Sequence, residues 1–343
     1  MAAQSLYTEL YQLLEAGETV FLLSEYETDG SISQKLVRQS DAGLFASIAE
    51  LQLSPDALTR GPLTTLQNPK GSLVVLERFM ARPRLIILGG GHISLALADM
   101  ADLTDFDTLV YDDRPSFANH QRFRTAKTVI CDSFTKLAEH IRFGPSDFVV
   151  DVTRGHLHDR ECLEVLLAGP EPAYTGMIGS QRRVALVLST LKKEGFSAQR
   201  IEHIHAPIGL SIGAQTPSEI AVAIMAEIIA VKRTGREQTQ WLSSSLDMIE
   251  AVARNGFVPE AVITVLATQG SVPTEVGCKL GMTYEGALAG TVGGGCSEAE
   301  ALQIGRELIR KGGWKIHDID LTDSAEDEGM VCGGTMRVLI QKA

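Results

Sequence analysis

The sequence has no concentrated positive charge, and this absence narrows the range of partners. The chain has 343 residues and a formal net charge of -12, and lysines and arginines follow one another no more than two at a time, as in Arg182-Arg183 and Lys192-Lys193. Long-range attraction to nucleic acid or to anionic lipid is therefore disfavoured. We expect no nucleic-acid partner.

Cysteines and long apolar runs are also scarce. The five cysteines are odd in number and form no C-x-x-C pair, while His203 and His205 lack further ligands at metal-binding spacing. This pattern favours a reducing compartment, argues against a cysteine zinc site, and makes metal binding by the two histidines the less favoured interpretation. The apolar run Ile220–Val231 is too short to span a bilayer, and the first ten residues lack the basic and apolar regions of a signal peptide. We expect a cytoplasmic protein without a membrane segment.

The remaining composition is that of a folded protein with two or three domains. Apolar periodicity separates a first block, residues 1–80, a middle block, 84–233, and a last block, 245–343, with a polar linker before the last one. The first block begins with an amphipathic helical pattern and a buried strand at 19–23. We predict that each of the three blocks is an α/β structure.

The middle block alternates short apolar runs with helical patterns. Candidate strands lie at 85–88, 108–111, 128–131 and 147–150, and a long helix is predicted over 218–233. Such runs are typical of strands buried on both faces of a parallel sheet. The prediction is a central Rossmann-like, doubly wound parallel sheet flanked by smaller α/β elements.

A glycine turn follows the first of these strands. Gly89, Gly91 and Ser94 fit the pattern G-x-G-x-x-G with serine as the third small residue, and His92 stands inside the motif. The first glycine permits the turn, the second lets a pyrophosphate approach the helix N-terminus, and the third position needs a small residue for packing. The turn predicts a dinucleotide site, with a flavodoxin-like domain without ligand as the alternative.

An acidic pair stands where the ribose of such a nucleotide would lie. Asp112 and Asp113 follow the second strand, about 20 residues after the glycines, which is the position of a carboxylate that binds a ribose 2′-hydroxyl. Arg114 could instead accommodate a 2′-phosphate. NAD(P) or a related nucleotide is the predicted ligand, and the choice between NAD and NADP stays open.

Two further loops follow strands of the same sheet. Thr153, Arg154 and His156 come after the strand at 147–150, where ligands of such sheets bind. The alternative is a structural loop in which Asp159 caps the next helix. Ser180 opens another helix, either as a site residue or as its N-cap.

The last block contains a glycine turn with a cysteine. The amides of Gly293, Gly294 and Gly295 precede Cys296, between a predicted strand at 289–292 and a predicted helix. Open N–H groups bind anions, and a helix N-terminus stabilises a thiolate. The turn therefore predicts an anion cradle beside a reactive sulfur.

Neighbouring residues modify this prediction. Ser297 and Glu300 fit a capping box, which would place Cys296 just before the N-cap, while Glu298 and Glu300 compete with an anion for the same N-terminus. Cys332 stands in a second glycine turn, Cys332-Gly-Gly. The alternative is that both cysteines are buried and inert.

A weak internal repeat links the first and last blocks. Thr28-Asp-Gly-Ser-Ile32 and Thr268-Gln-Gly-Ser-Val272 each follow a strand, and each leads to a Lys-Leu pair, at Lys35 and Lys279. Either the first block is a degenerate copy of the last, or the similarity is chance.

Taken in order, these motifs resemble the XdhC/CoxI family, the accessory proteins of molybdenum hydroxylases such as xanthine dehydrogenase. The last block resembles its XdhC/CoxI domain and the middle block its Rossmann domain, on the motifs Thr268-Gln-Gly-Ser-Val-Pro273, Gly290-Thr-Val-Gly-Gly-Gly-Cys296-Ser-Glu298, Cys332-Gly-Gly-Thr335, Gly89-Gly-Gly-His92, Asp112-Asp-Arg-Pro115, Thr153-Arg-Gly-His156, Gly176-Met-Ile-Gly-Ser180 and His205-Ala-Pro-Ile-Gly-Leu210.

The resemblance implies a role in cofactor maturation. Family members bind the molybdenum cofactor, support its sulfuration by a cysteine desulfurase and deliver it to an apo-hydroxylase. By resemblance, Cys296 and Cys332 are the reactive residues, Cys296 contacts the molybdenum, and Gly293–Gly295 hold the pterin phosphate. We also expect a homodimer.

The sequence departs from the family pattern in three ways. The cysteine domain follows the Rossmann domain instead of preceding it, the first block lacks a Gly-Gly-Gly-Cys turn, and Thr274–Cys278 lacks the usual basic residue. Two alternatives come from other functional classes: an NAD(P)-dependent oxidoreductase with His156 as proton donor, or a non-catalytic nucleotide sensor.

Overall fold

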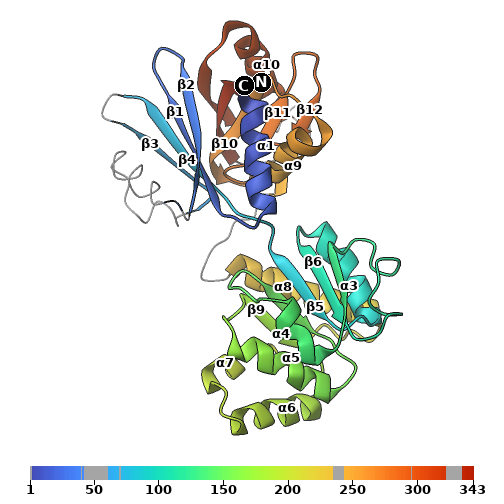
Figure 1. Ribbon diagram of the computed structural model, residues 1–343. Helices are drawn as coiled ribbons and strands as arrows, with labels where there is room; N and C mark the ends of the chain where they lie inside the picture. The colour runs from blue at the N-terminus through green and yellow to red at the C-terminus, as the bar shows by residue number, and fades with distance from the viewer. Residues whose placement is uncertain are drawn as a thin grey trace. The chain divides into compact units, whose positions relative to one another are not determined.

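The structure is a computed structural model that describes residues 2–39, 41, 61–68, 71–234, 243–294, 296–321 and 334–343. It divides into two compact units: unit 1 consists of residues 1–81 with 239–343, and unit 2 of residues 82–238 (Figure 1). Within those described ranges, no helix is long and apolar enough to cross a membrane.

Unit 2 contains the predicted parallel sheet. Its five strands have the order β7-β6-β5-β8-β9, and every neighbouring pair is parallel. The chain runs outward from β5 through β6 to β7 and then returns to the other side of β5 with β8, so the direction of winding changes between β5 and β8. The strands are β5 (Arg84–Leu88), β6 (Asp107–Asp112), β7 (Thr128–Cys131), β8 (Phe148–Asp151) and β9 (Tyr174–Met177).

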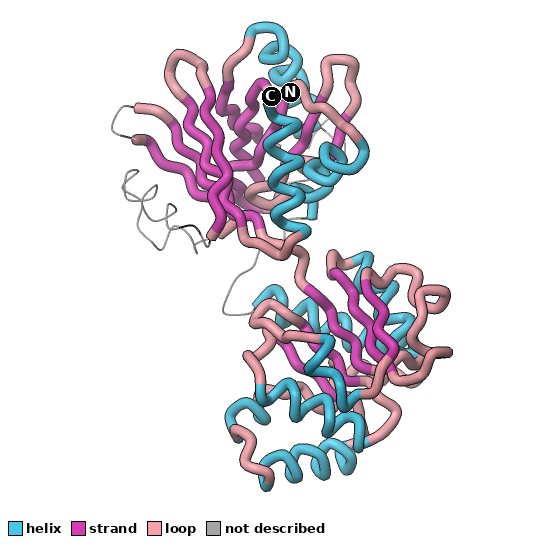
Figure 2. The backbone as a smooth tube through the Cα atoms, viewed as in Figure 1, coloured by secondary structure: helices cyan, strands magenta, loops and turns pink. Residues whose placement is uncertain are grey.

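Helices cover both faces of this sheet (Figure 2). On one face, α3 (His92–Leu103) and α8 (Pro217–Thr234) pack on alternate strand residues such as Ile87, and on the other face Ile86 packs against α5 (His156–Ala168). The strands are therefore apolar on both sides, as the sequence predicted. The remaining helices are η2 (Phe134–Lys136), α4 (Leu137–His140), α6 (Gln181–Lys193) and α7 (Ala198–Glu202).

Unit 1 is built from two antiparallel sheets, of order β2-β1-β4-β3 and β12-β11-β10-β14-β13. The first sheet contains β1 (Val20–Tyr26), β2 (Ile32–Arg38), β3 (Leu63–Gln67) and β4 (Leu73–Phe79). The second contains β10 (Ala261–Gly270), β11 (Lys279–Met282), β12 (Leu288–Gly290), β13 (Trp314–Asp320) and β14 (Gly334–Lys342). Its helices are α1 (Ala2–Glu15), α9 (Ser243–Asn255) and α10 (Cys296–Lys311).

The two sheets share one topology, which supports the internal repeat. The order β2-β1-β4-β3 corresponds to β11-β10-β14-β13, and a helix precedes the first strand in both cases. The registers agree as well: Lys35 pairs with Leu23 and Lys279 pairs with Thr264, each partner being the fourth residue of its strand.

The predicted division made residues 1–80 and residues 245–343 two separate domains. In the structure these two blocks belong to one unit. They form one unit because α1, α9 and both sheets bury apolar side chains in a common core, which includes Leu10, Leu22, Met248 and Val262. Along the sequence, unit 2 is inserted between the two halves of unit 1.

A buried ion pair joins the two sheets of unit 1. Lys279 Nζ on β11 lies 2.7 Å from Glu77 Oε1 on β4 and donates a 2.8 Å hydrogen bond to Thr264 Oγ1, and both charged side chains are at most 5% exposed. Tyr26 donates to the Gln341 side chain beside them. Such a pair stabilises little by itself, but losing one partner leaves a buried charge without compensation.

We predict that Glu77→Gln lowers the free energy of unfolding of unit 1 by about 3 kcal/mol, because Lys279 keeps its charge in an apolar surrounding. The double variant Glu77→Leu/Lys279→Met removes both charges, so its loss should be clearly smaller. Urea unfolding of both variants tests this. A Glu77→Gln protein as stable as the wild type would contradict it.

Candidate functional site

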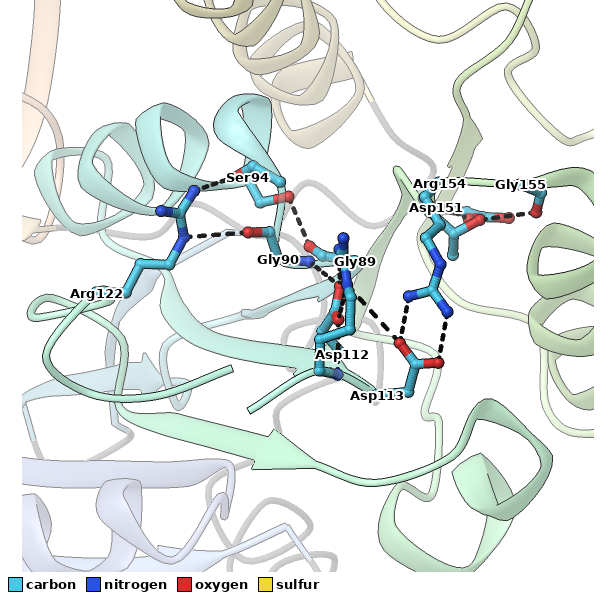
Figure 3. A network of polar contacts seen from close by, with 12 residues as sticks. Gly89, Gly90, Ser94, Asp112, Asp113, Arg122, Asp151, Arg154 and Gly155 are labelled. Atoms are coloured by element: carbon cyan, nitrogen blue, oxygen red, sulfur yellow. Dashed lines mark hydrogen bonds and ion pairs between the residues drawn. The ribbon is translucent and has the colours of Figure 1, made fainter. Parts of the chain in front are cut away.

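The candidate site of unit 2 lies at the carboxyl edge of its sheet, where the winding changes direction between β5 and β8. The turn Gly89–Gly91 leaves β5 there, and the loop 152–155 leaves β8 beside it (Figure 3). Ligands of open α/β sheets bind in the crevice outside this edge.

The three glycines of the first turn have different reasons to be glycine. Gly89 has a φ of 110°, and a Cβ there would lie 2.6 Å from the Val152 carbonyl oxygen, while a Cβ on Gly90 would collide with the Phe117 carbonyl. Ser94 is buried and donates a 2.6 Å hydrogen bond to the Gly89 carbonyl, which confirms its predicted packing role. Gly91, in contrast, has a φ of -69° and open space where a Cβ would be, so the fold does not require glycine there.

Two helices begin at this edge of the sheet without a side-chain cap. Gly91 is the N-cap of α3 and Gly155 the N-cap of α5; among the described residues no side chain caps either helix, and a Cβ on either glycine would meet nothing within 4 Å. His92 and His156 are their first residues. Uncapped N–H groups and the positive end of the helix dipole favour an anion between them.

The other helix starts on this edge are closed by their own residues. Ser180 caps α6 by accepting a 3.3 Å hydrogen bond from the Arg183 N–H, so its N-cap role is confirmed. At the start of α8, the Glu219 carboxylate accepts from the Gln215 and Thr216 N–H groups. The alternative prediction that Asp159 caps α5 is wrong, because Asp159 lies inside that helix.

Asp112 is already saturated with donors. Its buried carboxylate accepts from the Gly90 N–H at 2.7 Å and from three groups of Arg114, namely the backbone N–H, Nε and Nη2, at 2.8–2.9 Å. Burial raises the pKa of Asp112, but the hydrogen bonds of Arg114 and Gly90 outweigh burial and hold it below its ordinary value. A carboxylate offers about four acceptor sites, so no site is left for a ribose hydroxyl in this conformation.

Further arginines tie the surrounding loops together (Figure 3). Arg122 donates to the carbonyls of Gly90 and Gly91, both at 3.2 Å. Arg154 forms a two-pronged pair with Asp113, with its Nη2 2.8 Å from Oδ2. The pair links the end of β6 to the loop after β8, and it lowers the pKa of Asp113.

The glycine turn of unit 1 binds an oxyanion that the chain itself supplies. Glu298 Oε1 accepts hydrogen bonds from the Val292 N–H at 3.1 Å, the Gly294 N–H at 3.0 Å and the Thr291 hydroxyl at 2.6 Å. The Gly293 N–H donates to Thr291 Oγ1 at 3.1 Å. The predicted competition by Glu298 is thus present, and an external anion would have to displace this carboxylate.

The capping box predicted beside it was wrong. Helix α10 begins at Cys296, so Ser297 lies inside the helix and is not its N-cap, and Glu300 pairs with His317 at 2.7 Å. Cys278 is buried in the apolar core of unit 1. Gly295, Cys332 and the side chain of Cys296 lie outside the described part of the chain.

Comparison with known proteins decides the family. Residues 85–228 match the XdhC Rossmann domain, and residues 256–320 match the XdhC and CoxI family. The chain belongs to the XdhC/CoxI family. Its Rossmann domain is unit 2, and its XdhC/CoxI segment lies in the second half of unit 1.

Similar proteins carry related names. The chain is 32% identical to a probable xanthine dehydrogenase subunit of Bacillus subtilis over 227 residues, 66% of this chain and 65% of that protein. It is 38% identical to YqeB of Escherichia coli (44% of this chain, 28% of YqeB) and 29% identical to the molybdenum cofactor insertion chaperone PaoD of the same organism (43% and 40%). The matched parts thus span less than two thirds of each relative.

A solved structure agrees with the fold. The crystal structure of a xanthine dehydrogenase from Bacillus halodurans is similar with a TM-score of 0.53 and 25% identity, covering 68% of this chain and 65% of that one.

The XdhC-type unit 2 also contains a buried polar cluster that the motifs did not reveal. Thr153, predicted to face the ligand, is 4% exposed and donates to Asp159, which accepts two 2.6 Å hydrogen bonds from Arg183. Asp151 lies beside them at the end of β8, fully buried, and its Oδ2 has no hydrogen-bond partner among the described residues. Asp159 and Arg183 are 24 positions apart on different helices, so no local pattern signals their pairing.

The second carboxyl group of this cluster has a raised pKa. Burial raises the pKa of Asp151 well above its ordinary value, and the negative charge of Asp159 raises it further, although the Thr153 N–H and Arg183 act against them. The folded protein thus keeps the Asp151 proton at pH values where the unfolded chain, with an ordinary carboxyl pKa near 4, has released it. The stability that this proton contributes is complete below the ordinary pKa and is lost as pH rises toward the raised one.

We predict that Asp151→Asn removes this pH-dependent loss of stability, because the asparagine side chain stays neutral at every pH. Between about pH 5 and pH 8 the wild type should lose at least about 1 kcal/mol of unfolding free energy relative to the variant. Urea unfolding at several pH values measures the difference, and Asp102→Asn on the exposed side of α3 is the control. Parallel pH profiles of wild type and Asp151→Asn would contradict the assignment.

Proposed function

We propose that the chain is an accessory factor of a molybdenum hydroxylase of the xanthine dehydrogenase type, which binds the molybdenum cofactor as cargo and supports its sulfuration and insertion. The names of the Bacillus subtilis relative and of PaoD support this role. Its partners would be the apo-hydroxylase and a cysteine desulfurase, and the working form a homodimer in the cytoplasm.

The observation that carries the proposal is the oxyanion nest at the start of α10. Three donors converge on one carboxylate oxygen of Glu298, and Cys296 follows at the first position of the helix. The cofactor carries a phosphate, and a phosphate suits the same N–H groups. Exchange of Glu298 for the phosphate would bring the cofactor to the start of the helix at Cys296, and a helix N-terminus is a position that stabilises a thiolate.

In this arrangement the residues have separate roles. The amides of Gly293–Gly295 bind the pterin phosphate, Cys296 contacts the molybdenum, and Cys332 assists in the transfer of sulfur. Glu298 keeps the nest in place while no cargo is bound, because its carboxylate accepts hydrogen bonds from the Val292 and Gly294 N–H groups.

Cys296→Ser tests the role of the sulfur. We expect the variant to lose most of its ability to activate the apo-hydroxylase, because a serine oxygen neither transfers sulfur nor binds a soft metal as a thiolate does. The measurement is hydroxylase activity after incubation with cofactor-loaded protein. Equal cofactor binding together with equal activation would refute the role of Cys296.

A second variant tests the exchange at the nest. Glu298→Gln keeps the size of the side chain but removes its charge, so the phosphate meets a weaker competitor and cofactor affinity should rise about three- to tenfold. Glu300→Gln is the matched control, because Glu300 lies on the same helical turn but pairs with His317. A cofactor affinity unchanged or reduced in Glu298→Gln alone would contradict the exchange.

The crevice of unit 2 supports a second binding function, which we infer to be for NAD(P) or a related nucleotide. Gly91 and Gly155 leave space above two uncapped helix N-termini, and no feature of the described fold requires that space. An oxidoreductase activity would need a proton donor there, and His156 is the candidate. Steady turnover of NAD(P)H with a small carbonyl compound would distinguish such an enzyme from a nucleotide-sensing accessory factor.

A further inference from the structure

The acidic residue that marks an NAD site is blocked in this protein by its own neighbour. In NAD-binding sheets the carboxylate after the second strand accepts the ribose 2′-hydroxyl. Here the Asp112 side chain is 2% exposed, and the Arg114 guanidinium lies on it with two hydrogen bonds of 2.8 Å. A ribose hydroxyl could bind Asp112 only by displacing a charge-assisted, two-pronged pair.

Arg114 itself remains open to a ligand. Its side chain is 32% exposed, its Nη1 has no hydrogen-bond partner among the described residues, and its guanidinium lies 3.7 Å from the centre of the Phe117 ring. Stacking on an aromatic ring and pairing with Asp112 fix the plane of the guanidinium. The free edge is therefore held in one orientation, as a phosphate-binding arginine requires.

The charge of the surroundings favours an added anion. Asp112 and Asp113 are each paired with an arginine, Arg114 and Arg154, and Arg122 adds one more positive charge beside the glycine turn. The uncapped start of α3 contributes its dipole in addition.

We propose that this crevice selects a dinucleotide with a phosphate on its adenosine ribose, of the NADP type, and that Arg114 determines the choice. The phosphate binds the free edge of the guanidinium while Asp112 continues to hold the other edge. The proposal rests on the inferred nucleotide site of unit 2 but not on the accessory role of unit 1.

The test is a comparison of NADPH and NADH binding to the full chain, by titration of the nucleotide fluorescence and by calorimetry. We expect the wild type to bind NADPH at least about tenfold more tightly than NADH. Arg114→Ala should abolish the preference for NADPH for two reasons. NADPH loses the contact to its phosphate, and NADH gains access to an Asp112 that Arg114 no longer blocks. Arg124→Ala, an exposed arginine nearby in the sequence, is the matched control and should keep the wild-type ratio.

A second variant keeps the test decisive if Arg114→Ala is unstable. Asp112→Asn retains the shape of the side chain and the acceptor for Gly90 but loses the ion pair, so the preference for NADPH should persist or grow. Tighter binding of NADH by the wild type, an unchanged ratio in Arg114→Ala, or binding of neither nucleotide at millimolar concentration would each overturn the proposal. Hydroxylase activation by the same preparations would show independently whether the accessory role holds.

Discussion

Carboxylates of the chain itself accept hydrogen bonds from amides of both glycine turns, and we propose that this pairing controls access to both candidate sites. Asp112 accepts from Gly90 in unit 2, and Glu298 accepts from Val292 and Gly294 in unit 1. In unit 2 a single amide of the turn, the Gly90 N–H, binds the carboxylate, whereas in unit 1 two amides and the Thr291 hydroxyl converge on one oxygen. The two carboxylates differ in their surroundings: Asp112 is buried and paired with Arg114, whereas Glu298 lies on the first turn of a helix and accepts hydrogen bonds from Thr291, Val292 and Gly294.

This difference suits the two turns to the different tasks that we propose for them. A fixed carboxylate that is paired with an arginine suits recognition. The arginine presents a hydrogen-bond donor to the ligand, where the carboxylate alone would present an acceptor. A carboxylate that can be exchanged suits the transient holding of cargo, since release of the cargo restores the internal hydrogen bonds. The insertion of unit 2 between two similar halves of unit 1 places both tasks on one chain, and the ion pair between Lys279 and Glu77 joins those halves.

The sequence predicted the elements that depend on local pattern. The parallel strands, the turn at Gly89, the packing of Ser94 and the cap at Ser180 all follow from short-range periodicity and spacing, and all are present. Two predictions of helix caps failed because the side chain pairs with a residue distant in sequence. Asp159, predicted to cap α5, pairs with Arg183 on another helix, and Glu300, predicted to belong to a capping box, pairs with His317. The fusion of the first and last blocks into one unit left only a weak trace in the sequence, the repeated Lys-Leu pair, because strand pairing across a long insertion has no local signature.

The most direct test of the central claim is native mass spectrometry of the chain purified gently from its own host while a molybdenum hydroxylase is being assembled. We predict a discrete added mass that corresponds to a phosphate-bearing pterin cofactor and that is lost when excess phosphate is added. The bare mass of the chain, found under conditions in which the hydroxylase of the same cells acquires its cofactor, would contradict it.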